Sequence, residues 1–301
     1  MKRIALLILI LGCITNAQAC LNGEIYELKD GSILYEDYDE RIVPRGHAFF
    51  PDEFDGALHN LDSLWKKTKD VDYLSDYALV LALKKQYDES AKIYLQIEKM
   101  SPGRYSTASN LGTVYELMGQ NEKALQWISK AVAINPQSHK NSEWIHVNIL
   151  KAKIEGEDAI NSEFLLDTDF GDSASPSSRL DHQELVALRD ALYYQLNERV
   201  TFVDPPDKIV AVLLFNLADI AWLTGERTDA VRVYGIAEEY GMDGEFFKSR
   251  YNNAKTKIIV LNPAATMKRS YSALVPLMLG GLGLCVVAIF VVVRKVKARR
   301  N

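Results

Sequence analysis

The sequence predicts an all-α protein: a stack of antiparallel helix hairpins, exported by a signal peptide and followed by one C-terminal transmembrane helix. Nine Pro and 17 Gly in 301 residues leave long stretches without helix-breaking residues. Large and small residues recur with a spacing of 34 residues, and an uncharged apolar run stands near each end. Together these observations favour helices over a turn-rich sandwich or barrel.

The amino-terminal residues have the pattern of a secretory signal peptide over residues 1–19. A basic pair precedes an apolar run, and the small residues of Ala17-Gln18-Ala19 form a cleavage site. The apolar run is shorter than the roughly 20 residues that cross a bilayer. Cys20 then becomes the first mature residue and begins an N-terminal segment over 20–50. Lipidation of Cys20 is an alternative that would add a second anchor.

The carboxyl-terminal part has the pattern of a membrane anchor. Residues 273–293 form an uncharged run of 21 residues, which spans about 31 Å as a helix and matches the hydrocarbon core. The tail over 294–301 holds five basic residues, so it is predicted to be cytoplasmic. Residues 261–272 then form a juxtamembrane linker. The sequence therefore predicts a single-pass membrane protein, in the bacterial inner membrane, with residues 20–272 in the periplasm.

The body between these two ends is acidic. Without the seven Lys and Arg residues of the ends, 28 basic residues stand against 40 acidic ones, a net charge of −12. Such a body repels phosphate backbones, and the sequence has no basic stripe. We therefore expect no nucleic-acid partner.

Two consecutive segments carry similar residues at the same spacing. The matched positions are Tyr77, Ala78, Leu81, Ser90, Tyr94, Ile97 and Pro102 in the first segment, and Leu111, Gly112, Tyr115, Ala124, Ile128, Ala131 and Pro136 in the second. Small residues at these positions let two helices cross closely, and each proline stops the second helix. Gly119 is placed to end a helix, and Asn121 is a candidate N-cap for the next.

The second segment resembles the tetratricopeptide repeat, a helical hairpin of 34 residues with a Leu-Gly-x2-Tyr, Ala, Ala, Pro pattern. A third match runs through Leu217, Ala218, Ala221, Gly225, Ala230, Tyr234 and Ala237. The resemblance implies a helical domain over 51–260, with its clearest repeats at 71–104, 105–138 and 211–244. Degenerate hairpins are expected between 139 and 210.

The same resemblance implies a concave groove that binds a protein or peptide partner. Carried over by spacing, the residues facing this groove are Asp72, Ser75, Leu79, Ser106, Ser109, Thr113, Glu116, Val212, Phe215, Asp219 and Trp222. Their mixed character suits an extended or helical partner with apolar anchors and some basic character. The implied function is a non-catalytic scaffold for protein–protein interaction in the cell envelope.

The sequence has no hydrolase elbow, phosphate-binding loop or dinucleotide-binding glycine motif. We therefore expect no catalytic residue, no cofactor and no metal. His139 and His146 are spaced to share a helical face, but packing histidines are favoured over zinc ligands. An envelope enzyme, or its regulatory subunit, with a site made of dispersed carboxylates is the alternative function.

Two segments depart from the helical pattern. Residues 25–35 alternate about Asp30-Gly31, which predicts a small β-hairpin. Residues 167–181 are acidic and have no period, which predicts an exposed loop.

Overall fold

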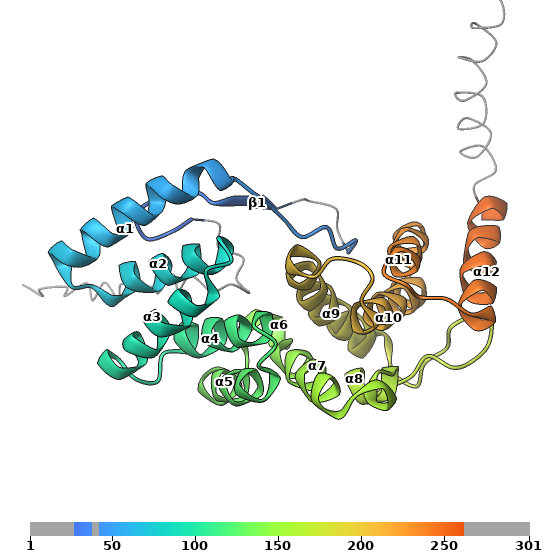
Figure 1. Cartoon of the computed structure of the whole chain (residues 1–301). Coiled ribbons are helices and arrows are strands. Elements are labelled where there is room, and N and C mark those ends of the chain that lie inside the picture. The colour runs from blue at the N-terminus through green and yellow to red at the C-terminus, as the bar shows by residue number, and fades with distance from the viewer. Residues whose placement is uncertain (1–26, 38–41, 262–301) are drawn as a thin grey trace, which may run out of the picture. The chain divides into compact units, whose positions relative to one another are not determined.

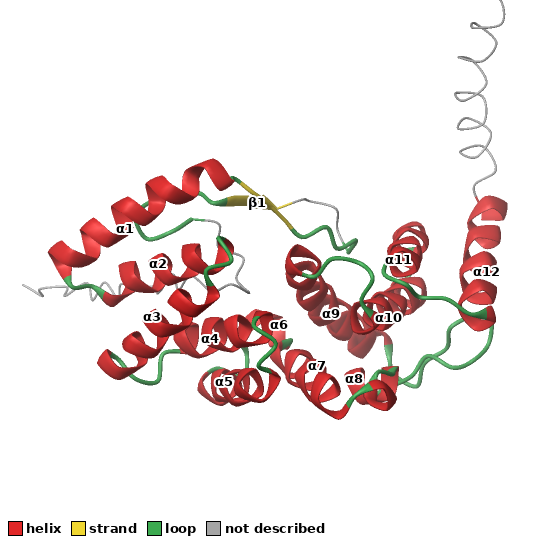
Figure 2. Ribbon diagram, in the orientation of Figure 1, coloured by secondary structure: helices red, strands yellow, loops and turns green. Residues whose placement is uncertain are grey.

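The computed structural model of the chain describes residues 27–37 and 42–261. Helices make up nearly all of the regular structure there, beside two short strands (Figure 1, Figure 2). The predicted signal peptide (1–19), the transmembrane helix (273–293) and the basic tail lie outside the described residues. Among the helices that are described, none has both the length and the apolar character needed to cross a bilayer.

The chain divides into two compact units. The second unit contains Ser173–Ser175 and helix α12 (Glu245–Leu261). Within it, the Arg250 guanidinium donates to the Ser173 carbonyl oxygen from Nε at 3.1 Å and from Nη2 at 2.8 Å. Asn253 Nδ2 donates to the Ala174 carbonyl oxygen at 2.6 Å. These bonds hold the three-residue loop on α12.

The first unit contains the rest of the described chain up to Asp243. Its elements in chain order are β1 (Tyr35–Asp37), β2 (His47–Phe49), η1 (Pro51–Glu53), α1 (Phe54–Thr68), α2 (Val71–Leu83), α3 (Tyr87–Met100), α4 (Tyr105–Leu117), α5 (Asn121–Ile134), α6 (Ser138–Asn141), α7 (Glu143–Glu155), η2 (Glu157–Ala159), α8 (Ser162–Leu166), α9 (His182–Phe202), α10 (Lys208–Thr224) and α11 (Arg227–Glu239).

Helices that follow one another pack together, as a stack of hairpins requires. α1 packs on α2, α2 on α3, α3 on α4, α4 on α5 and α5 on α7, and α10 pairs with both α9 and α11. The predicted all-α stack of helix hairpins is therefore confirmed for the described residues. Tyr94 and Tyr234 are fully buried, because each fills the space between the two helices of its hairpin.

The two prolines of the recurring pattern stand where a helix has just ended. α3 ends at Met100, two residues before Pro102, and α5 ends at Ile134, two residues before Pro136. A proline cannot donate the hydrogen bond that the next helical turn would need. The boundaries predicted from these residues are confirmed.

Gly112 explains why a small residue is required in α4. A Cβ atom at Gly112 would lie 2.6 Å from Ile128 Cδ1 and 3.1 Å from the Ile128 backbone nitrogen, so α4 and α5 cross in close contact. Gly119 follows α4 with φ +72°, as its position predicted. The N-cap prediction was wrong by one residue: Asn121 is the first residue of α5, and Gln120 is the cap.

The region between 139 and 210 is less regular than two degenerate hairpins. α7 is followed only by the short helices η2 and α8, and then by an irregular stretch that reaches α9. Residues 167–181 form this stretch, as predicted, but Phe170 within it is buried. α9 begins at a capping box between Asp181 and Glu184, which satisfies the first backbone N–H groups of the helix.

The N-terminal β structure is smaller than the predicted hairpin and has a second part. Glu27 and Ile33 form an antiparallel bridge about a turn in which Gly31 has φ +86°. Beyond this turn, β1 pairs with β2 in an antiparallel register that places Tyr35 opposite Phe49. The second pairing joins segments that the alternation pattern did not connect.

Candidate functional site

A cavity of about 310 Å³ lies between α4, α7 and α9 in the first unit. Its lining residues are Thr113, Glu116, Leu117, His146, Lys153, Gln195, Glu198, Arg199, Phe202, Val203 and Asp204. The wall therefore combines ionic groups of both signs with apolar side chains from the end of α4 and the end of α9.

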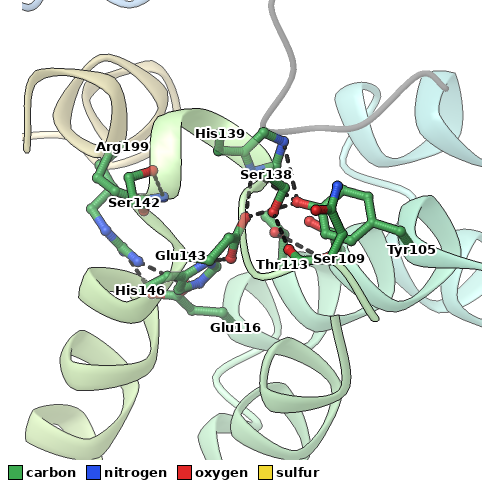
Figure 3. A network of polar contacts seen from close by, with 12 residues as sticks. Tyr105, Ser109, Thr113, Glu116, Ser138, His139, Ser142, Glu143, His146 and Arg199 are labelled. Carbon is green, nitrogen blue, oxygen red and sulfur yellow. Dashed lines mark hydrogen bonds and ion pairs between the residues drawn. The ribbon is translucent and has the colours of Figure 1, made fainter. Parts of the chain in front are cut away.

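Glu116 is the centre of the ionic part of this wall, and three cationic side chains contact its carboxylate. Figure 3 shows two of them, His146 and Arg199. Its Oε2 lies 2.6 Å from His146 Nε2, and its Oε1 lies 2.6 Å from Lys153 Nζ. Arg199 Nη1 donates to Oε1 at 2.8 Å and Nη2 donates to Oε2 at 3.3 Å. Three helices are tied together through this one carboxylate.

The surroundings of Glu116 favour its charged form. Burial by itself would raise the pKa of this carboxyl, but Arg199, His146 and Lys153 hold the pKa well below its usual range. Burial likewise acts to lower the pKa of His146, and the carboxylates of Glu116 and Glu143 outweigh it and raise that pKa. The cluster therefore keeps a carboxylate and an imidazolium together in the protein interior.

A second carboxylate extends the network away from the cavity (Figure 3). Glu143 Oε1 pairs with His139 Nδ1 and accepts a hydrogen bond from the Tyr105 hydroxyl at 3.2 Å. Its Oε2 lies 3.7 Å from His146 Nδ1. Burial acts to raise the pKa of Glu143, whereas the hydrogen bond from His139 and the nearby imidazole of His146 lower it, and the lowering is the larger effect.

The short helix α6 positions His139 by an unusual backbone. His139, Lys140 and Asn141 all have positive φ, at 50°, 56° and 60°. A left-handed conformation costs a non-glycine residue roughly 1–2 kcal/mol. The turn places the His139 ring against the Tyr194 ring of α9, with centroids 5.1 Å apart and an interplanar angle of 17°. Strain of this kind persists only where the surrounding contacts hold it.

The α4–α5 hairpin supplies Thr113, Glu116 and Leu117 to the cavity, and its sequence matches a known family over residues 105–138. That family is the tetratricopeptide repeat. The first helix of this repeat, α4, therefore presents its carboxyl-terminal turn to the cavity. Its second helix, α5, packs on α7, which supplies His146 and Lys153.

Among solved structures, the chain is similar to a tetratricopeptide repeat protein from Parabacteroides merdae. The likeness covers 68% of this chain and 93% of that chain, with 13% sequence identity and a TM-score of 0.33. Likeness at this level says nothing of shared function. No curated protein matches the sequence.

Of the eleven residues predicted to face a groove, Thr113 and Glu116 line the cavity. Four of the other members on α2 and α4 are buried, namely Ser75, Leu79, Ser106 and Ser109. Asp72 lies at the start of α2, where it pairs with Lys29 Nζ at 2.8 Å and with Arg104. That these residues contact a partner stays a prediction.

The four members on α10 lie apart from the cavity. Phe215 and Asp219 are buried, and Asp219 accepts a hydrogen bond from Tyr234 of α11. Val212 and Trp222 are partly exposed. The Trp222 ring lies 5.4 Å from the Arg227 guanidinium. These four residues therefore do not line the cavity, and that they face a partner stays a prediction.

Lys153, Glu198 and Arg199 were not predicted, although they line the cavity. They lie on α7 and α9, whose sequences lack the repeat pattern that located the other positions. One signal in the sequence was a charged residue at the end of an otherwise apolar stripe, since Arg199 closely follows the apolar residues of α9. The structure shows that Arg199 is buried. In the part of the chain that the structure describes, no group of three or more His, Cys, Asp and Glu side chains is placed to hold a metal ion.

Proposed function

We propose that the chain is a non-catalytic scaffold that binds a protein partner at the membrane of the bacterial envelope. The observation that carries the proposal is the cavity beside the tetratricopeptide repeat. Leu117, Phe202 and Val203 offer an apolar pocket for an anchoring side chain, and Asp204 adds a charge at its edge. A peptide is commonly recognised by this combination of an apolar pocket and a few polar groups.

The partner that fits is an extended or helical segment with an apolar anchor and some basic character. The body of the chain carries a net charge of −12 when the basic ends are left out. Such a charge attracts basic partners and accelerates their encounter.

Photo-cross-linking in the native host tests this scaffold role. A photoreactive amino acid at Leu117, in the cavity, should give a cross-linked product that the same amino acid at Lys92 on α3 does not give. Asp204→Lys should weaken the product because it reverses the charge at the cavity edge. Asp88→Lys, on an exposed part of α3, is the matched control. Equal products from Leu117 and Lys92 would contradict the proposal.

We also propose the periplasmic address from the two ends of the sequence, which lie outside the described residues. Mass analysis of the mature amino end tests it. An unmodified Cys20 at the terminus is expected, whereas a lipid-modified Cys20 would support the alternative of a second anchor. A chain that still begins at Met1 would contradict signal cleavage.

The alternative function, an envelope enzyme, has one observation in its favour, which is the Glu116–His146 pair at the cavity. A general acid or base works best with a pKa near the working pH. The pKa of Glu116 is lowered and that of His146 is raised, and each shift favours the charged form of its group. This favours a structural role for the pair. Turnover of peptide or peptidoglycan substrates by the full chain, lost in Glu116→Gln, would support the enzyme instead.

A further inference from the structure

A stretch of the chain that we call the inner segment (residues 42–49) passes beside α9 in the first unit, and its last three residues form β2 (Figure 1). At its start, Ile42 is buried in a small apolar cluster with Ala221 of α10 and Ala230 of α11, and Trp222, one of the predicted groove residues, packs against this cluster. At its end, the ring of Phe49 lies 6.2 Å from the ring of Phe202. The chain itself therefore covers part of the surface predicted to face a partner.

Two side chains of α9 hold three successive backbone N–H groups of the inner segment. Asn197 Oδ1 accepts from the backbone nitrogens of Arg45 and Gly46, each at 3.0 Å. Thr201 Oγ1 accepts from the backbone nitrogen of His47 at 3.0 Å. The Thr201 hydroxyl donates to the Asn197 carbonyl oxygen at 2.9 Å, which turns its lone pairs toward the segment. Backbone contacts of this kind fit any extended peptide.

Two further contacts select particular side chains. A Cβ atom at Gly46 would lie 2.8 Å from Thr201 Oγ1, and Gly46 has φ +70°, so only glycine fits there. His47 Nε2 lies 3.1 Å from Glu198 Oε1, and both side chains are almost fully buried. A residue that donates a hydrogen bond or carries positive charge is therefore favoured next to the glycine.

The surface that holds the inner segment continues into the cavity. Glu198 and Phe202 line the cavity and also contact His47 and Phe49 of the inner segment. A peptide that leaves the cavity along α9 would meet the inner segment. Since the inner segment is tethered to this surface, its effective concentration is in the millimolar range, which favours its own binding over that of a free ligand.

We propose that the inner segment is a tethered occupant of a peptide-docking surface on α9 and α10, and that a segment of a partner replaces it. The partner segment is extended. It carries an aliphatic residue, then a glycine four positions later, a basic residue or histidine directly after the glycine, and an aromatic residue two positions beyond that. This inference rests on the proposed scaffold function and adds the chemistry of the partner.

The test uses a fluorescent synthetic peptide of residues 42–50 and the full-length chain in detergent. Gly46→Val should release the chain's own inner segment, and the peptide should then bind at least about tenfold more tightly than to the wild type. Gly56→Val is the matched control, because a Cβ at Gly56 on α1 meets nothing within 4 Å. A peptide that carries the Gly46→Val change should not bind, and adding Asn197→Leu to the chain should abolish binding.

Equal peptide binding to Gly46→Val and to the wild type would overturn the inference. Should Gly46→Val fail to fold, hydrogen exchange of the wild type decides. The amides of Arg45, Gly46 and His47 should exchange by a local opening that leaves the amides of α9 protected. If the amides of Arg45, Gly46 and His47 exchanged only in the same opening event as the amides of α9, the inference would also be overturned. In either case a cross-link from Leu117 that persists leaves the scaffold function standing, so the two failures are distinguishable.

Discussion

Arg199 of α9 and Glu116 of α4 form a two-point ion pair between positions 83 residues apart in the sequence, with nitrogen–oxygen distances of 2.8 and 3.3 Å. Glu116 lies within residues 105–138, which match the tetratricopeptide repeat model, and Arg199 lies outside that range. A buried pair of this kind is strongly destabilising when one partner is removed, because the other charge is left without compensation. The pair therefore holds α9 beside α4.

Glu116→Gln should destabilise the chain by about 3 kcal/mol, because Arg199 and Lys153 would keep their charges beside a neutral amide. Urea unfolding followed by circular dichroism measures the free energy of unfolding. Glu122→Gln, at an exposed position of α5, is the control and should change stability little. A loss for Glu116→Gln no larger than for the control would show that the cluster does not hold α9.

The free energy of unfolding should depend on pH through the ion pair between His146 and Glu116. The pKa of His146 is raised in the folded state. Its contribution to the free energy of unfolding is therefore complete below about pH 6.5 and is lost as the pH rises through the pKa of the folded state. The pKa of Glu116 is lowered in the folded state. Its contribution to the free energy of unfolding is therefore complete above about pH 4.5 and is lost as the pH falls through the pKa of the folded state. The pair therefore contributes most between these two values.

Measured between pH 6 and 9, the loss of stability should be smaller in His146→Asn than in the wild type. The quantity to compare is the slope with pH, since the substitution also lowers stability overall. His59→Asn, at an exposed position of α1, should keep the wild-type slope. Identical slopes in all three proteins would mean that His146 does not titrate in this way.

Asp76→Asn should stabilise the chain at neutral pH. Burial raises the pKa of Asp76 to about 7, although the carboxylate accepts a hydrogen bond from the Lys29 backbone nitrogen at 2.7 Å. The ionised form is thus costly in the fold, and this cost grows as the pH rises from about 4 toward 7. Asparagine keeps an acceptor oxygen and carries no charge, so a gain of up to about 4 kcal/mol at pH 8 follows.

Thermal unfolding at pH 4 and pH 8 measures this gain. The difference between Asp76→Asn and the wild type should be small at pH 4 and large at pH 8. Asp62→Asn, at a partly exposed position of α1 that pairs with Lys66, is the control. A gain of equal size at both pH values would show that the effect of Asp76→Asn is not one of charge.

Gly112→Val should destabilise the chain by about 2 kcal/mol, because the added atoms would enter the contact between α4 and Ile128 of α5. Gly56→Val on α1 meets no neighbour and should be neutral or slightly stabilising. Urea unfolding compares the two variants. The same stability in both would mean that α4 and α5 do not need a small residue where they cross.

The sequence was sufficient to predict the hairpins that carry a strict pattern. Gly112 and the two prolines act locally, by close approach of two helices and by the loss of one backbone donor, so their spacing alone locates α2 to α5. α7 and α9 have apolar stripes but no such local constraint. Their helices and the irregular stretch over 167–181 were expected, and the short helices η2 and α8 were not.

The groove residues were predicted from spacing within each repeat, which assumes that successive first helices face one open surface. Ser106 and Ser109 are buried. Trp222 packs against the small apolar cluster that contains Ile42 of the inner segment. Spacing within a repeat could not predict the contact at Trp222, because Ile42 comes from a distant part of the chain.

From the sequence alone come the helical hairpins, their boundaries and the acidic character of the body, since each depends on residues close together along the chain. Only the tertiary structure decided that Glu116 would be compensated by His146, Lys153 and Arg199, and that residues 42–49 would lie on α9. Which charged groups and backbone groups become partners depends on how the helices pack in space. That packing results from many contacts between residues far apart in the sequence, so no single stretch of sequence determines it.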